Sequence, residues 1–449
     1  MTLHTSGARR VITAVLVAIA GMVTFASIQT VDAASRAATA PKAGKPDGDR
    51  AGQSVQARKK SKAAKRRARA RARAKRKIGP AGLRFYRPAG PLPRGHGRLI
   101  WQRKVVSRPL KSAAGTRRVL YTSTTLAGKR TAVSGTVSFP KGRPPAGGWP
   151  VITYAHGTTG IADKCAPSRN LIKGPALTYV NYVYPEINAW LRAGYAVLQT
   201  DYLGLGGPGV HPYLVGIPEG RSVLDIVRAA RTFQFFPKLS NRFLIAGHSQ
   251  GGHAALFASG LAAKWTPEIK LRGTVAYAPA SHLKEQAALL KLLTQPSPAS
   301  ALAGLIFRGM SVDFNQVKPL QLLSDPALAL YPQTLSQCVP FLIKPTSLGG
   351  LAPANLIKPD SDLDPLYEVL AKQNPAVRTA APIFLAQGTA DTTVLPAFTN
   401  LLDGELTTLN DSVDYKTYPG ADHSGVIPAA EKDVMTFFAS RLPGARNRP

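Results

Sequence analysis

The sequence predicts an α/β protein, in which helices flank a mostly parallel central sheet and a helical cap is inserted late in the chain. Short apolar runs alternate with helical patterns between about residues 150 and 280, which is typical of a parallel sheet covered on both faces. About 100 residues then separate two further runs, far more than one crossover helix needs. We therefore expect a cap at about residues 281–380.

The first residues of the chain indicate export. Arg9 and Arg10 precede a long uncharged stretch rich in Ala, Val and Ile, and Val31-Asp32-Ala33 places small residues before a cleavage point after Ala33. We interpret residues 1–33 as a signal peptide. The apolar stretch is also barely long enough to span a bilayer, so retention as a signal-anchor is the alternative. Either way, an extracellular or cell-envelope location is expected.

Nearly half of the formal net charge of +34 lies in the first 77 residues. Residues 41–77 hold 16 Lys and Arg residues against only Asp47 and Asp49, and we interpret residues 34–80 as a disordered basic linker. The run 58–77 lacks aromatic side chains on which bases could stack, and an exported protein meets little DNA, which argues against specific nucleic-acid binding. The functional alternative is adhesion of residues 58–77 to an anionic cell-envelope or membrane surface.

The folded domain is predicted over residues 81–449. Strand candidates are apolar runs rich in β-branched and aromatic residues, bounded by Gly or Pro; they cover residues 99–106, 118–124, 132–139, 151–155, 196–200, 243–246, 274–277, 383–386 and 414–418. Helical spacing of apolar residues predicts helices over 222–235 and 252–263, and within the cap over 287–293 and 301–307.

The strongest chemical signal is Gly247-His248-Ser249-Gln250-Gly251, which follows the strand 243–246 and precedes the helix 252–263. This strand–turn–helix context is what a nucleophile elbow requires. Gly247 and Gly251 permit a turn too tight for larger side chains, so that Ser249 stands exposed at the carboxyl edge of the sheet. We predict Ser249 as the nucleophile, in preference to a structural Gly-Ser turn.

A serine nucleophile needs a base and an orienting carboxylate, in the chain order Ser, acid, His. His423 lies in a small-residue loop after the last predicted strand, whereas His282 lies at the start of the cap and is read as a cap or surface histidine. Asp391 follows the strand 383–386 in a Gly-containing loop. Asp422 adjoins His423, but chain neighbours rarely reach each other's ring nitrogens. We therefore predict Asp391 and His423.

The oxyanion of an acyl-transfer intermediate needs backbone donors. One is the N–H of Gln250, next to the nucleophile, and the other is expected from the loop 156–160, where we favour Thr158. His156 is expected to hold that loop. Asp201 and Tyr202 follow another strand end, either as a tight loop or as part of the acyl site.

Cys165 and Cys338 are the only cysteines. Export makes a disulfide between the two possible, and it would tie the loop after residues 156–160 to the cap. Two free, buried thiols are the alternative.

The chain resembles the secretory lipase family of α/β-hydrolases, the fungal lipase A type that also includes exported actinobacterial lipases. The resemblance spans about residues 98–440 and is carried by the segments 118–124, 156–160, 165–168, 201–206, 247–252 and 388–391. Of these, Cys-Ala-Pro-Ser at 165–168 and Asp-Tyr-Leu-Gly at 201–204 are more specific than the elbow. Fungal members have a second disulfide, which two cysteines cannot supply.

The resemblance implies an α/β-hydrolase fold, a lid-bearing cap, a triad of Ser249, Asp391 and His423, and hydrolysis of acylglycerols or other carboxylic esters. It also supports pairing Cys165 with a cap cysteine. The role of residues 41–77 stays open, because the basic segment matches nothing in the family.

The expected function is an exported serine ester hydrolase, most simply a lipase acting on lipid esters. Two alternatives remain: an envelope acyltransferase or peptidase with the same triad, and a non-catalytic polycationic envelope-binding protein. No metal or organic cofactor is indicated, because no helix carries a paired His-Glu zinc motif and the Gly-rich segments fit turns.

Overall fold

The computed structural model describes residues 61, 64, 77–232 and 238–444. The predicted signal peptide and most of the predicted basic linker lie outside these residues. At the start of the described range 77–232, the Gln102 N–H donates to the Lys77 carbonyl (2.9 Å) and the Gly79 N–H donates to the Gln102 carbonyl (3.0 Å). Within the described part, each helix is too short or too polar to cross a membrane.

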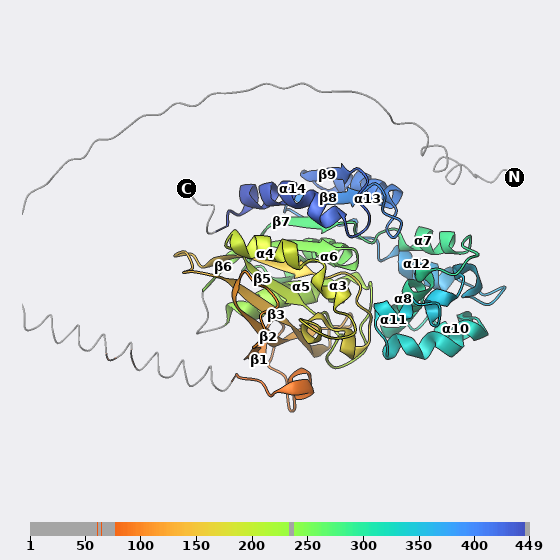
Figure 1. Cartoon of the computed structure of the whole chain (residues 1–449), viewed down its shortest axis with the longest axis horizontal. Helices are drawn as coiled ribbons and strands as arrows, with labels where there is room; N and C mark the ends of the chain where they lie inside the picture. Colours follow the sequence, from red (N-terminus) through yellow and green to blue (C-terminus); the bar gives the residue numbers. More distant parts are fainter. Residues whose placement is uncertain (1–60, 62–63, 65–76, 233–237, 445–449) are drawn as a thin grey trace, which may run out of the picture. The chain divides into compact units, whose positions relative to one another are not determined.

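The described strands form one sheet in the order β1-β2-β3-β5-β4-β6-β7-β8-β9 (Figure 1). The pairs β1–β2, β2–β3 and β3–β5 are antiparallel, and the remaining pairs are parallel. This confirms the predicted mostly parallel sheet. The strands are β1 Leu99–Lys104, β2 Ala113–Thr124, β3 Arg130–Pro140, β4 Trp149–Ala155, β5 Ala196–Thr200, β6 Leu239–His248, β7 Lys270–Tyr277, β8 Ile383–Gly388 and β9 Val413–Tyr418.

Helices cover both faces of the sheet, as its nearly continuous apolar strands require. In β4, Val151 packs in the core beneath α5 (Gly216–Arg231) and α6 (Gln250–Trp265), whereas Ile152 packs beneath α4 (Tyr184–Arg192) and α14 (Val426–Arg441). Successive side chains of a strand point to opposite faces, so each buried strand supplies both cores. The helix α13 (Pro396–Leu409) packs through Leu402 and Leu406 against β8.

The predicted helix over 222–235 is wrong in its bounds, because α5 spans Gly216–Arg231. Pro218 lies in the first turn of this helix. Proline is tolerated in the first helical turn, where its missing N–H has no intrahelical partner, so the helix begins before it. The predicted helix over 252–263 lies within α6.

The segment between β7 and β8 forms the inserted helical cap (Figure 1). Its helices share an apolar core with Tyr213, Leu214 and Val215 of the body. The cap helix predicted over 287–293 is shifted, since α7 is Leu283–Leu290, whereas 301–307 lies within α8. The cap helices are α7 Leu283–Leu290, α8 Pro298–Asp313, α9 Pro319–Leu322, α10 Asp325–Leu330, α11 Val339–Leu342 and α12 Asp364–Ala371, with 3₁₀ turns at Tyr331–Leu335, Leu348–Gly350 and Pro353–Asn355.

Cys165 and Cys338 form a disulfide with an S–S distance of 2.05 Å, which confirms the predicted pairing. It joins a short 3₁₀ turn after β4 (Asp163–Cys165) to the residue preceding α11. Gly160 lies directly against it, because a Cβ there would stand 3.0 Å from the Cys165 Sγ. The connection therefore ties the loop after β4 to the cap. Between β4 and β5 the chain also forms the 3₁₀ turn Pro167–Arg169 and the helix α3 (Thr178–Asn181).

Candidate active site

Ser249 stands at the turn between β6 and α6 with φ 60° and ψ −120°, a conformation that costs a non-glycine residue about 1–3 kcal/mol. Three backbone bonds hold it. Its N–H donates to the Tyr277 carbonyl (2.9 Å), and its own carbonyl accepts from the N–H groups of His253 (3.1 Å) and Ala280 (3.2 Å). The neighbouring strand and the helix thus over-determine the strained turn.

The glycines that flank Ser249 are required by close backbone approach. A Cβ on Gly247 would overlap the Gly251 carbonyl, and a Cβ on Gly251 would overlap the Ala155 carbonyl at the end of β4. The first turn of α6 therefore presses against the start of the loop 156–160. This contact brings Gln250 and the loop after β4 to the same edge of the sheet.

His423 lies in the loop after β9 and donates its Nδ1–H to the Asp391 Oδ2 at 2.7 Å. Asp391 follows β8, as predicted, and its carboxylate is buried. Its other oxygen accepts the backbone N–H groups of Thr393 (2.8 Å) and Val394 (2.9 Å). The imidazole is about one-fifth exposed, which leaves its Nε2 as the nitrogen available for proton transfer.

Burial alone would raise the pKa of Asp391. The hydrogen bond from His423 and its charge, with the two backbone amides, outweigh that effect and bring the pKa below its ordinary value. Asp391 therefore stays ionised near neutral pH. An ionised partner orients the His423 ring and stabilises its protonated form.

His248 joins the histidine loop to the elbow. Its Nε2–H donates to the His423 carbonyl (2.7 Å), and its Nδ1 accepts from the Tyr182 hydroxyl (2.7 Å). The two imidazole rings lie 4.5 Å apart between centroids. Burial lowers the pKa of His248 to about 3, so the ring is neutral. Because His248 precedes Ser249, this bond brings the His423 loop beside the nucleophile candidate.

The two predicted oxyanion donors belong to segments that contact each other, the first turn of α6 and the loop after β4. Gln250 is buried at the first position of α6, and Thr158 is half-buried in the loop after β4. The Thr158 hydroxyl bonds to the Tyr213 hydroxyl at 2.7 Å. Gly157 lies against His248, since a Cβ there would stand 3.3 Å from the His248 carbonyl.

Other candidates have structural partners. His156 donates its Nδ1–H to the Gly157 carbonyl (2.7 Å), and burial lowers its pKa to about 4. Asp201 is buried and accepts bonds from Ser168, including its backbone N–H (2.8 Å). The Tyr202 hydroxyl donates to the His156 carbonyl (2.9 Å). These residues support the loop that carries Thr158.

The rejected alternatives, His282 and Asp422, have other partners. His282 pairs through its Nε2 with Glu405 at 3.3 Å. Asp422 accepts the backbone N–H groups of Ser424 (3.1 Å) and Gly425 (2.7 Å), which is the role of a turn residue.

Three site residues escaped the sequence reasoning: His248, Tyr213 and Glu219. Glu219 is buried on α5, and Gln250 donates to its carboxylate at 2.6 Å. Glu219 lies outside the predicted helix 222–235, and only the observed start of α5 at Gly216 places it four residues before Val223, on the same buried face. A charged residue on a core-facing stripe indicates a partner in the core.

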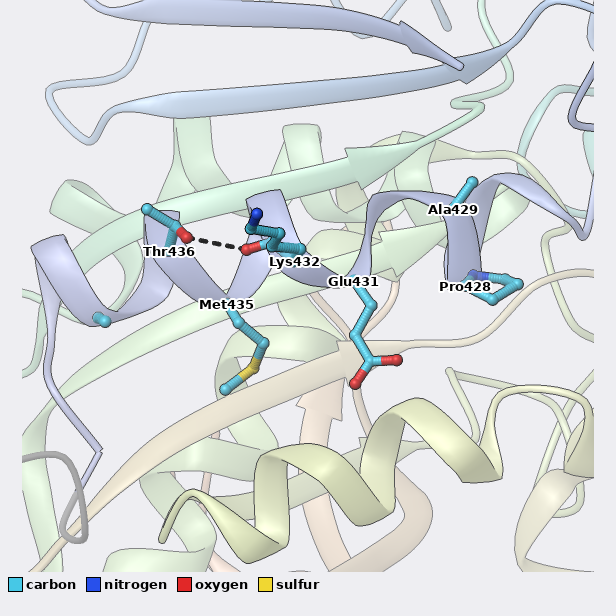
Figure 2. Close-up of a pocket in the computed structure, with 7 residues that line it drawn as sticks. Pro428, Ala429, Glu431, Lys432, Met435 and Thr436 are labelled. Atoms are coloured by element: carbon cyan, nitrogen blue, oxygen red, sulfur yellow. Dashed lines mark hydrogen bonds between the residues drawn. The ribbon is translucent and has the colours of Figure 1, made fainter. Parts of the chain in front are cut away.

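A surface groove of about 650 Å³ lies on α14, remote in sequence from the elbow (Figure 2). Its lining consists of Pro428, Ala429, Glu431, Lys432, Met435, Thr436 and Ala439. Figure 2 shows Glu431 and Met435 pointing to the same side of the helix. In the described ranges, no group of three or more His, Cys, Asp or Glu side chains is placed to hold a metal ion.

An elbow serine, a buried Asp–His pair and a capped, mostly parallel sheet together define a class of fold, that of the α/β-hydrolases. The model of the secretory lipase family matches residues 178–320 of this chain. The resemblance to that family is thereby confirmed. Lipase A of Moesziomyces aphidis is 29% identical over 133 residues, which cover 29% of this chain and 28% of that protein.

Solved structures show the same fold. Candida antarctica lipase A superposes with a TM-score of 0.66 at 20% identity, covering 83% of this chain and 86% of that one. The rice cell wall degrading esterase LipA from Xanthomonas oryzae gives 0.62 at 18% identity, covering 79% of this chain and 100% of that one. At these identities the likeness establishes the architecture alone.

Proposed function

We propose that the chain is an exported serine ester hydrolase that uses Ser249, His423 and Asp391. The observation that carries the proposal is the 2.7 Å bond between Asp391 and His423, in a loop held against the residue before Ser249. The match to the secretory lipase family supports the same class.

In the proposed reaction, the Ser249 hydroxyl attacks the ester carbonyl while the His423 Nε2 takes its proton. The N–H groups of Thr158 and Gln250 stabilise the oxyanion that forms. His423 then protonates the departing alcohol, which leaves an acyl-enzyme. Water, deprotonated by His423, attacks this ester and releases the acid. Asp391 stabilises the charged imidazole in both halves of the cycle.

Lipid esters are the proposed substrates. The cap packs an extensive apolar core and also exposes Leu289, Leu292, Leu293 and Leu320. Such a cap suits long, poorly soluble acyl chains. Lipase A relatives and a cell wall degrading esterase are both among the similar proteins, so acylglycerols are the first substrate class to test and other carboxylic esters the second.

Export and surface attachment are proposals that rest on composition. The apolar segment after Arg9 and Arg10 supports export, and the name of the matching family agrees with it. The basic run 58–77 supports attachment to an anionic cell-envelope or membrane surface.

Hydrolysis of p-nitrophenyl esters from two to sixteen carbons, by the wild type and by Ser249→Ala, tests the proposal. We expect the wild type to cleave them and the variant to lose at least about 10⁴-fold in kcat, because the acyl-enzyme cannot form. A serine-reactive phosphonate should label only the wild type. The chain-length profile separates lipase from esterase.

Unchanged activity of Ser249→Ala would refute the assignment of the nucleophile. A labelled wild type that transfers acyl groups to added alcohols faster than to water would favour an acyltransferase. Amide cleavage exceeding ester cleavage would favour a peptidase.

A further inference from the structure

A buried polar cluster lies directly behind the proposed oxyanion donors. Its centre is Glu219 on α5, whose side chain is entirely buried. Around it stand Gln250 and His253 of α6, His211, and the backbone of Leu214. Burying a carboxylate is costly unless it is well partnered, so this group needs a physical reason to be there.

The first connection runs from Glu219 to Gln250. The Gln250 Nε2 donates one hydrogen to the Glu219 Oε1 (2.6 Å) and lies 2.9 Å from the His211 Nε2. His211 donates its Nδ1–H to the Leu203 carbonyl (2.9 Å), so its Nε2 carries a lone pair and accepts the second amide hydrogen. Both donors of the Gln250 side chain are therefore used, which fixes the residue whose backbone N–H is the first proposed oxyanion donor.

The neutral state of His211 agrees with this arrangement. Burial lowers its pKa to about 4, although the nearby Glu219 charge raises it. The 3.4 Å separation of the His211 Nε2 and the Glu219 Oε1 is therefore not an ion pair near neutral pH. Gln250 lies between the two acceptors and donates to each.

The second connection runs from Glu219 to Thr158. The same Oε1 accepts the Leu214 N–H at 3.0 Å. Leu214 has a φ of 59°, a left-handed conformation that a β-carbon disfavours and that needs such support. The preceding residue, Tyr213, bonds through its hydroxyl to the Thr158 hydroxyl (2.7 Å). One carboxylate oxygen thus anchors the loop that contacts the second proposed oxyanion donor.

The remaining oxygen faces His253. The Glu219 Oε2 and the His253 Nδ1 are buried without a hydrogen-bond partner and lie 3.4 Å apart. The His253 Nε2–H already donates to the Gln373 carbonyl (3.0 Å). Both oxygens of the Glu219 carboxylate therefore face buried polar groups, Oε1 the donors Gln250 and Leu214 and Oε2 the His253 ring.

We propose that Glu219 is the positioning residue of the oxyanion hole, holding Gln250 through its side chain and Thr158 through Leu214 and Tyr213. This inference rests on the proposed function. Glu219 does not touch the reacting atoms; it fixes the two backbone donors where charge develops in the transition state. Preorganised donors are worth most when they need no rearrangement at the moment of reaction.

The test compares Glu219→Ala with Glu219→Gln. Removing the carboxylate frees both donor residues, and we expect kcat per phosphonate-labelled site to fall about 10- to 100-fold with KM changed less than about threefold, somewhat less than deleting a donor outright. Glu219→Gln should retain kcat within about fivefold, because its amide oxygen can accept from Gln250 and Leu214 while its NH₂ donates to the His253 Nδ1.

Inhibition by a trifluoromethyl ketone, which forms a tetrahedral oxyanion adduct with the serine, provides the second readout. The Ki should rise in Glu219→Ala by about the factor that kcat/KM falls, because both report binding of the oxyanion. Inhibition by a product fatty acid should change less.

Glu186→Ala is the matched control. Glu186 is also a buried glutamate, on α4, where the Trp190 Nε1–H donates to it at 2.9 Å. The same truncation there should lower thermal stability while leaving kcat and the ketone Ki within about twofold, since no hydrogen bond joins it to Thr158 or Gln250.

Glu219→Ala with wild-type kcat and Ki overturns the inference and leaves the proposed function standing. If that variant does not fold, Tyr213→Phe and Gln250→Met each cut one connection while keeping the backbone donors. Either should lower kcat and raise the ketone Ki, and wild-type values in both overturn the inference. If wild-type protein cleaves no ester, the proposed function fails, and the inference falls with it.

Discussion

At the scale of single residues, the hydrogen-bond partner separates His423 from the three buried histidines that surround the elbow and the loop after β4. His156, His211 and His248 each donate a ring N–H to a backbone carbonyl and are buried, and burial lowers their pKa values to about 4, 4 and 3. His423 instead donates to the carboxylate of Asp391 and keeps part of its ring exposed. A carboxylate partner stabilises a protonated imidazole, which a carbonyl does only weakly.

Replacement of Asp391 tests this distinction. In Asp391→Asn the side-chain amide can present an N–H to His423 and so favour the wrong tautomer, and we expect kcat to fall about 10³- to 10⁴-fold with the fold intact. Ester hydrolysis and circular dichroism measure the two effects. Asp422→Asn is the control, because its amide oxygen can still accept from Ser424 and Gly425, and it should stay within about threefold. A loss below tenfold in Asp391→Asn would contradict the proposed role.

At the scale of elements, the packing of the helices on the sheet buries one glutamate near a second one, which disfavours the ionised form of the buried side chain. Glu186 of α4 is buried, and Glu431 of α14, visible beside the groove in Figure 2, adds a like charge. Burial, and secondarily Glu431, raise the pKa of Glu186 from 4.5 to about 7. The folded protein therefore holds a proton there that the unfolded chain releases at lower pH.

Glu186 therefore makes the stability of the fold depend on pH. The proton held by Glu186 contributes fully to the free energy of unfolding below about pH 4.5. This contribution, up to roughly 3 kcal/mol, is lost as the pH rises through 7. Glu186→Gln removes this titration, so its free energy of unfolding should exceed that of the wild type increasingly between pH 5 and pH 8. Urea unfolding at four pH values measures the difference. A difference that does not change with pH would show that Glu186 titrates normally in the fold.

At the scale of the whole described domain, the cap is joined to the body both covalently and by packing. The disulfide connects positions 173 residues apart. Close by, the Val339 N–H donates to the Thr159 carbonyl at 3.1 Å, next to the proposed oxyanion residue Thr158. The position of the cap and the geometry of the loop after β4 are therefore coupled.

Loss of the disulfide should lower both the stability and the activity of the protein. A crosslink closing a loop this long contributes about 2–5 kcal/mol through the unfolded chain. We expect Cys165→Ser/Cys338→Ser to lower the free energy of unfolding by that amount, with a smaller decrease in kcat. Urea unfolding of the double variant, with reduced wild type as the comparison, measures the first effect. An unchanged midpoint would mean that packing alone holds the cap.

Local signals predict much of the candidate site. The elbow can be read from Gly247 to Gly251 because close packing of backbone admits only glycine there. Asp391 and His423 follow strand ends, and parallel strands bring such ends to one edge. The strands were recognisable for the same reason, since buried parallel strands are continuous apolar runs. Helix ends were less predictable: α5 begins at Gly216 and α7 at Leu283, where turn residues and the αL conformation of His282 decide the bounds.

The sequence by itself determined the α/β class and the inserted cap, and it predicts the elbow serine and the residues expected around it, because short-range sterics and hydrophobic periodicity act along the chain. Only the tertiary structure decided which buried polar groups meet. Glu219 of α5 accepts a hydrogen bond from Gln250 of α6, and Tyr213 bonds to Thr158, which lies 55 residues earlier in the chain. Such pairings depend on how the helices pack on the sheet, and no pattern of neighbouring residues encodes the distance between their side chains.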